Sequence, residues 1–269
     1  MSGDAPHPSP PAACTLRVRY AKRGTLRWTS HRDVARSVER AIRRAGLPMA
    51  YSQGFSPHPR LSWAGAAPTG CASEAEYLEL RLVRDVDPEA VRRELDAALP
   101  AGLVVLEVVR AGPGALADRL GVSRWRLRLP GVPAERLRVA VRALLAAPSV
   151  QVERLTKDGP RPVDARAAVV DAHVGEASPD DGPGPCGILD VVVRQVSPAV
   201  RPDDVLSALR IVAGLELPVP ASATRLAQGR LDDDGRLTDP LAPDRAPARP
   251  GAGGGEPRSE QDGVAVHAG

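Results

Sequence analysis

Residues 28–60, WTSHRDVARSVERAIRRAGLPMAYSQGFSPHPR, predict one capped helix followed by a stiff loop. Ser30 and Asp33 form the S-x-x-D pattern of a capping box, so we expect the helix to begin just after Ser30. Gly46 and Pro48 are the corresponding stop signals. Between them apolar residues recur at helical spacing, which predicts one buried face. These apolar residues are Val34, Val38, Ala41, Ile42 and Ala45.

A second face of this predicted helix is rich in arginine. Arg32, Arg36, Arg40 and Arg44 follow an i, i+4 row, and Arg43 falls close to it. The planar guanidinium group binds phosphates well and stacks on bases. The row is therefore a candidate phosphate-binding surface, and a solvated helix face is the alternative.

The loop at residues 51–60, YSQGFSPHPR, is predicted to be rigid and functional. Pro57 and Pro59 fix their own φ angles and favour extended geometry at Ser56 and His58. Aromatic rings in such a loop can stack on bases, although Tyr51, Phe55 and Trp63 could equally be core residues. The candidate RNA- or phosphate-binding residues here are Tyr51, Ser52, Gly54, Phe55 and Arg60.

Two histidines lie at the two ends of this stretch. His31 is the first expected helical residue, where the helix dipole disfavours its protonation, and His58 lies in the loop. Together they are candidate catalytic residues, acting as general acid and base, but His31 could instead simply pack. Their spacing with Asp33 is irregular, so we expect no metal site.

The three cysteines, at positions 14, 71 and 186, are far apart and form no C-x-x-C pair. An iron–sulfur or structural zinc site built from this chain alone is therefore not expected, and we predict no cofactor. The N-terminus lacks the apolar segment of a signal peptide, and no apolar run approaches the roughly 20 residues that span a membrane. We therefore expect a cytoplasmic protein that does not contact a membrane.

The 269 residues are 43% hydrophobic, which allows a real core, although only 3% are aromatic. A net charge of +3 is only mildly basic, but Lys22 and Lys157 are the only lysines, so arginine carries almost all the positive charge. Codon bias in a GC-rich genome explains part of this excess. The remaining signal is compatible with RNA as a partner.

Hydrophobic periodicity predicts an α+β fold of two tandem ferredoxin-like (βαββαβ) units. The first unit spans 14–110, a linker 111–122, and the second unit 123–231. A Pro-rich leader at 1–13 and a Gly-, Pro- and Asp-rich tail at 232–269 are expected to be disordered.

In the first unit we expect strands at 16–20, 61–67, 76–83 and 103–109, with 25–28 also extended. Its helices are expected at 31–45 and 88–99. In the second unit we expect strands at 124–129, 150–155, 163–170, 188–194 and 224–231, helices at 133–147 and 202–212, and a flexible loop at 174–187. Asp164 and Arg166 are expected to form an ion pair at a strand edge.

The stretch SHRDVARSVERAIRRAGLPMAYSQGFSPHPRLSW, residues 30–63, resembles the N-terminal signature of a bacterial radical-SAM-linked protein family. The resemblance continues at 73–77, 152–159, 163–166 and 201–209, and covers roughly residues 16–231. The family is labelled a domain of unknown function and is often fused behind a radical-SAM enzyme domain. The C-x-x-x-C-x-x-C cluster of that domain is absent here, so the resemblance implies the stand-alone form. Stand-alone relatives are often encoded near a ribonuclease.

Three hypotheses for the function follow. The first is an accessory RNA-binding module that acts with a radical-SAM enzyme or a ribonuclease in RNA modification or processing. The second is a metal-independent RNA-processing enzyme that uses His31 and His58. The third is a binder of a phosphate-bearing small molecule, with Arg36 and Arg40 on the phosphate.

Overall fold

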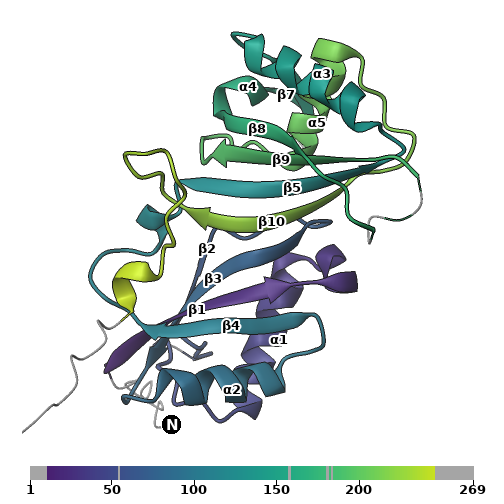
Figure 1. Cartoon of the computed structure of the whole chain (residues 1–269). Helices are drawn as coiled ribbons and strands as arrows, with labels where there is room; N and C mark the ends of the chain where they lie inside the picture. Colours follow the sequence, from purple (N-terminus) through teal and green to yellow (C-terminus); the bar gives the residue numbers. More distant parts are fainter. Residues whose placement is uncertain (1–10, 54, 157–158, 180–181, 183, 246–269) are drawn as a thin grey trace, which may run out of the picture.

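The computed structural model describes residues 11–245, apart from 54, 157–158, 180–181 and 183. Its main feature is one eight-stranded sheet (Figure 1). Seven of its strands lie in the order β4-β1-β3-β10-β5-β9-β8, and the eighth, β2, pairs with β3. Strands β6 and β7 form a separate two-stranded sheet. The fold is therefore α+β, as predicted, with a large and mostly antiparallel sheet.

The strands are β1 (Cys14–Lys22), β2 (Leu61–Ala64), β3 (Ala72–Leu82), β4 (Leu103–Arg110), β5 (Val122–Pro130), β6 (Gln151–Thr156), β7 (Gly159–Asp164), β8 (Val169–Gly175), β9 (Cys186–Arg194) and β10 (Ser222–Gly229). The helices are α1 (His31–Arg44), α2 (Pro88–Ala98), α3 (Ala134–Ala146), α4 (Ala165–Ala168) and α5 (Pro202–Ala213), with short 3₁₀ helices η1 (Gly24–Trp28), η2 (Ala117–Arg119) and η4 (Ala242–Asp244).

The N-terminal half is built on β4, β1, β3 and β2, and every neighbouring pair of these strands is antiparallel. Helices α1 and α2 cover one face of it, where their apolar stripes meet the inward residues of β1 and β3 in one core cluster. Alternate residues of a strand point to opposite faces, so Leu78 and Leu80 enter this core while Tyr77 faces the other side.

The C-terminal half is built on β10, β5, β9 and β8, whose neighbouring pairs are also antiparallel. Helices α3 and α5 pack on Trp125, Leu127 and Leu129 of β5 and on their neighbours in a second core cluster. The two halves meet where β10 runs parallel to β3, with Thr224 opposite Ala72 and Arg225 opposite Ser73. This short ladder joins the two halves into one sheet.

Helix α1 begins and ends where its sequence signals predicted. Ser30 is the N-cap: its Oγ accepts a hydrogen bond of 3.2 Å from the Asp33 N–H and donates one of 2.7 Å to the Asp33 carboxylate. Gly46 follows the C-cap with φ +63°, a left-handed conformation that glycine adopts without strain. The predicted stripe is buried at Val34, Val38, Ala41 and Ile42.

The expectation that residues 25–28 are extended is wrong. They lie in the 3₁₀ helix η1, which begins at Gly24 with φ +58°. Its turns are closed by backbone hydrogen bonds from Leu26 to Arg23 and from Thr29 to Leu26. The left-handed glycine reverses the chain after β1 and so prevents the strand from continuing.

The expectation of one strand at 163–170, with an ion pair between Asp164 and Arg166, is also wrong. Strand β7 ends at Asp164, whose carboxylate accepts hydrogen bonds from the N–H groups of Val150 and Ala167 and thereby caps the short helix α4. Arg166 instead donates to the carbonyls of Leu145 and Val169. A capping aspartate competes with the strand and divides it in two.

The first part of the tail at 232–269 is folded, contrary to prediction, and it packs with the predicted linker at 111–122. Leu116 and Leu120 are buried with Leu241 against Tyr77, on the face of the sheet opposite α1 and α2. The Asp244 side chain has no exposed surface and accepts hydrogen bonds from the Gly112 N–H and from Arg119. Residues up to 245 therefore belong to the N-terminal half, and 246–269 lie outside the described residues.

Most of the predicted leader, residues 1–10, also lies outside the described residues, as do parts of the predicted loop at 174–187. In the described part of that loop, β8 extends to Gly175 and β9 begins at Cys186. None of the described helices has both the length and the apolar character to cross a membrane.

Candidate functional site

The arginines predicted on α1 are all exposed to solvent. Arg36 pairs loosely with Asp33, at 3.5 Å between exposed groups, and Arg40 donates to the hydroxyl of Ser37. Arg44 differs, because it donates to the Ala98 carbonyl and ties α1 to α2. Arg32, Arg36, Arg40 and Arg43 therefore form an exposed cationic face, which we call the α1 arginine face.

The loop at 51–60 forms a closed hairpin on the edge of the sheet. The Ser52 N–H donates to the His58 carbonyl at 2.9 Å, and the His58 N–H donates back to the Ser52 hydroxyl at 3.0 Å. Phe55 at the tip is 96% exposed and Tyr51 is 36% exposed. Arg60 is also exposed, and Gly54 lies outside the described residues. The hairpin thus presents an aromatic ring at its tip.

The two histidines are not brought together. His31 rests edge-on against Trp63, with ring centroids 5.1 Å apart, and lines a pocket. His58 is exposed in the hairpin and lies outside that pocket's lining. Trp63 also contacts Tyr20 edge-on, so it packs on the core rather than joining an exposed stacking surface.

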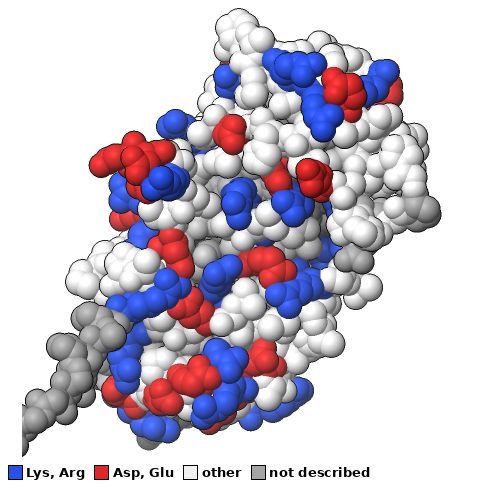
Figure 2. Space-filling view, viewed as in Figure 1, with Lys and Arg blue, Asp and Glu red and all other residues white. Residues whose placement is uncertain are grey.

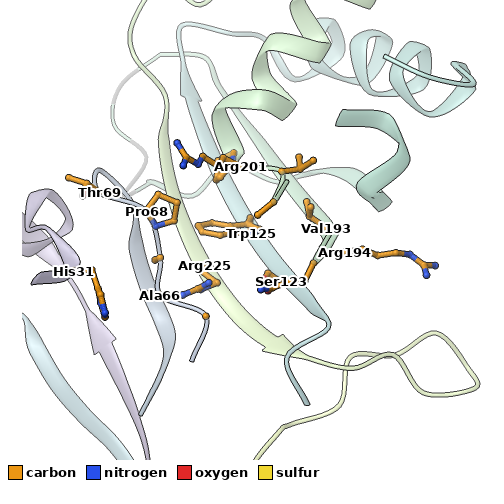
Figure 3. Close-up of a pocket in the computed structure, with 16 residues that line it drawn as sticks. His31, Ala66, Pro68, Thr69, Ser123, Trp125, Val193, Arg194, Arg201 and Arg225 are labelled. Carbon is orange, nitrogen blue, oxygen red and sulfur yellow. The ribbon is translucent and has the colours of Figure 1, made fainter. Parts of the chain in front are cut away.

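The pocket lined by His31 lies between the two halves and has a volume of about 440 Å³ (Figure 3). Its floor is the centre of the sheet, with Trp125 from β5 and Arg225 from β10. One wall is the Gly65–Thr69 segment after β2, and the opposite wall is the start of α5 with Arg201 and Pro202. We call this the junction pocket.

Arg225 is the buried arginine of the junction pocket. It is 4% exposed, and its guanidinium carbon lies 5.3 Å from the centroid of the Trp125 ring. Nη2 donates to Glu76 in a buried ion pair, and Nε donates to the hydroxyl of Ser73 at 3.4 Å. Within the described residues, Nη1 has no hydrogen-bond partner. It is therefore the donor that remains for a ligand.

The segment that forms one wall, residues 65–69, is held by three buried side chains. Glu76 accepts a hydrogen bond of 3.0 Å from the Ala67 N–H, Lys22 donates to the Pro68 carbonyl at 3.3 Å, and Gln228 donates to the Gly65 carbonyl at 3.3 Å. Burial lowers the pKa of Lys22, and the charge of Glu76 opposes that shift. The wall is thus rigid before any ligand arrives.

Charges of both signs alternate on the face of the molecule shown in Figure 2, without a large patch of one sign. Elsewhere in the described residues, salt bridges such as Arg126–Asp190 and Arg245–Glu107 pair charges of opposite sign. Among the described residues, no cluster of three or more histidine, cysteine, aspartate or glutamate side chains could hold a metal ion.

Sequence reasoning missed Arg225, Glu76, Trp125 and Arg201. One signal for Glu76 was available in the sequence. Glu76 lies two and four residues before Leu78 and Leu80, so it faces the same, inward side of the strand. A charged residue in that phase must find a buried partner. The partner could not be named, since Arg225 is 149 residues away in the chain.

Residues 15–202 match the family model described as "Uncharacterized protein conserved in bacteria (DUF2344)". The chain belongs to this family. The match spans most of both halves and ends at the first residue of α5. No curated protein matches the chain.

Solved structures resemble the chain only distantly. A Cbf5-Nop10-Gar1 complex is 12% identical with a TM-score of 0.40, over 78% of this chain and 47% of that one, so the chain spans about half its length. The first two RRM domains of yeast poly(U) binding protein (Pub1) are 13% identical with a TM-score of 0.22, and the match covers 78% of this chain and 98% of that one. DyPB from Rhodococcus jostii RHA1 is 13% identical with a TM-score of 0.19, and the match covers 75% of this chain and 84% of that one. TM-scores of this size carry no functional argument.

Proposed function

We propose that this chain is an accessory RNA-binding module, built from two ferredoxin-like units, that acts with a radical-SAM enzyme or a ribonuclease. The observations that carry the proposal are the α1 arginine face and the exposed aromatic hairpin that follows α1 in the chain. Helix α1 carries five arginines against two acidic residues, Asp33 and Glu39. Exposed arginines bind phosphates, and an exposed ring can stack on an unpaired base.

The choice of partner enzyme rests on the sequence resemblance to the radical-SAM-linked family. RNA as the ligand rests on the exposed residues themselves. An acid–base reaction at His31 and His58 has less support, because the two side chains share no contact within the described residues. The cytoplasm is the compartment in which such a module would meet RNA.

Replacing Arg36 and Arg40 together by Ala is expected to weaken the salt dependence of RNA binding. Single-stranded RNA gives a log–log slope of about −0.7 per neutralised phosphate, so the double variant should flatten the slope by about one to two units. Fluorescence anisotropy with labelled single-stranded RNA at several salt concentrations measures this slope.

Arg138 and Arg142 of α3 provide a matched control for that experiment. They too lie four residues apart on an exposed helix face, at 48% and 66% exposure, and their loss removes the same charge. Their double replacement by Ala should leave the slope nearly unchanged. Equal slopes for all three proteins, or a wild-type affinity without salt dependence, would contradict the proposal.

Phe55→Ala is expected to weaken RNA binding by a different route. A base stacked on the ring contributes about 1–3 kcal/mol, and this contribution carries no charge. The affinity should therefore fall while the salt slope stays the same. Phe55→Trp, which keeps an aromatic face, should retain the affinity, and a loss equal to that of the Ala variant would rule out stacking.

A further inference from the structure

We propose that the junction pocket binds one phosphate-bearing nucleotide, either free or as the end of an RNA chain. This inference deepens the proposed function, because it names a second contact point for RNA on the same side of the sheet as α1. A volume of about 440 Å³ lies in the range of small-ligand sites. Such a pocket has room for a single nucleotide and excludes a duplex.

The charge of the junction pocket favours an anion. Its lining includes the guanidinium groups of Arg201 and Arg225 together with His31, and no aspartate or glutamate is among the described lining residues. Behind the lining, Arg225 and the buried Lys22 both lie near the single carboxylate of Glu76. Two buried cations thus share one buried anion, and a phosphate on the free Nη1 of Arg225 would balance the remaining charge.

Arg201 supplies the second contact. Its guanidinium has no partner among the described residues, and Figure 3 shows it extending toward Thr69 on the opposite wall. It is the N-cap residue of the twelve-residue helix α5, so the positive end of the helix dipole adds to its charge. The nearby acid Asp204 is already neutralised by Arg154.

Arg194 differs from Arg201 in the direction of its side chain. In Figure 3 its guanidinium points away from Trp125 and out of the pocket, although Arg194 is one of the residues that line it. Removing this charge therefore changes the net charge of the protein without removing a pocket contact. It is the matched control for Arg201.

An exposed indole lies beside the rim of the pocket. Trp28 is 69% exposed and lies over Gly70, where an added Cβ would come within 3.2 Å of Cζ3 of the ring. Gly70 directly follows the wall residue Thr69. A cationic pocket with an exposed aromatic ring at its rim suits a phosphate joined to a base, which can stack on the ring.

The test is titration calorimetry of the full chain with the four nucleoside 5′-monophosphates and with the corresponding nucleosides. At least one monophosphate should bind about tenfold or more tightly than its nucleoside, because the phosphate adds charge-assisted hydrogen bonds. Arg201→Ala should remove most of that difference, while Arg194→Ala should change it less than about twofold. Both residues are exposed, so neither change should disturb the fold.

Short single-stranded RNAs with and without a terminal phosphate distinguish the two sources of the nucleotide. Preference for the phosphorylated RNA, with weak binding of free monophosphates, identifies an RNA end. Tight binding of the free monophosphate identifies a free nucleotide. Equal affinity for phosphorylated and unphosphorylated ligands in both series overturns the inference, and so do equal effects of Arg201→Ala and Arg194→Ala.

Failure of this inference can be distinguished from failure of the proposed function. Replacing Arg36 and Arg40 by Ala should leave monophosphate binding unchanged, because neither residue lines the pocket. A protein that binds monophosphates but shows no salt-dependent affinity for RNA would refute the proposed function alone. Salt-dependent RNA binding without any effect of the phosphate at the pocket would refute the pocket alone.

Discussion

Replacing Asp244 by Ala is expected to lower the free energy of unfolding by about 3–5 kcal/mol, as is typical when one partner of a buried ion pair is removed. The Asp244 carboxylate has no exposed surface and accepts hydrogen bonds from Arg17, Arg119 and the Gly112 N–H at 2.7–2.8 Å. Arg17 is itself 2% exposed, so it would keep Glu79 but lose its buried partner. Urea denaturation of the full chain at pH 7 measures the change.

Asp234 gives a control from the same C-terminal segment. Its carboxylate is 70% exposed and pairs with the exposed Arg236. Asp234→Ala should therefore change the unfolding free energy by less than about 0.5 kcal/mol. Similar effects of the two replacements would show that the segment ending at residue 245 does not contribute to the stability of the N-terminal half.

The contribution of Asp244 should also depend on pH. Burial by itself would raise the pKa of this carboxyl group, but hydrogen bonds from Arg17, Gly112 and Arg119 outweigh burial and hold the pKa below its ordinary value. A depressed pKa means that the stabilisation is complete above the unfolded value of about 3.9 and is lost as the pH falls toward the folded value. The stability difference between the wild type and Asp244→Asn should therefore be constant from pH 7 to about pH 5 and shrink below about pH 4. A difference that shrinks near neutral pH would contradict this assignment.

The parts of the fold that the sequence predicts well are those determined by local signals. Ser30, Gly46 and the apolar stripe between them are enough to place α1, because capping and amphipathicity act within a few residues. The exposure of the α1 arginines follows from the same stripe. Helix α4 is a partial exception, since the capping residue Asp164 was visible in the sequence but was assigned to a strand.

The parts that the sequence did not predict depend on contacts between distant segments. Residues 232–245 have the composition of a disordered tail, yet Asp244 finds Arg17 at a separation of 227 residues. Composition alone cannot reveal such a contact, because a single buried network of charged groups can order a segment whose other residues are polar. The junction pocket was hidden for the same reason, since its floor combines β5 with β10 and its walls come from both halves.

Glu76→Gln is expected to have the second large effect, a loss of about 3–5 kcal/mol in the free energy of unfolding. Glu76 is 3% exposed. It forms an ion pair with Arg225, accepts a hydrogen bond from the Ala67 N–H, and its charge stabilises the protonated form of the buried Lys22. Glutamine keeps the shape but removes the negative charge, which leaves two buried cations uncompensated. Because β3 and β10 share only a short ladder, this pair adds a buried side-chain connection between the two halves.

A double-mutant cycle with Arg225→Met separates this interaction from general damage to the core. Removing both charges together leaves fewer buried groups without partners, so the double variant should lose at least about 1 kcal/mol less than the sum of the two single losses. Equilibrium denaturation of the four proteins gives the coupling energy directly.

Additive losses would mean that Glu76 and Arg225 do not stabilise one another, and the junction would then depend on the apolar contacts around Trp125. A positive coupling would instead show that the guanidinium on the pocket floor is fixed in place before any ligand binds, as a preformed anion site requires.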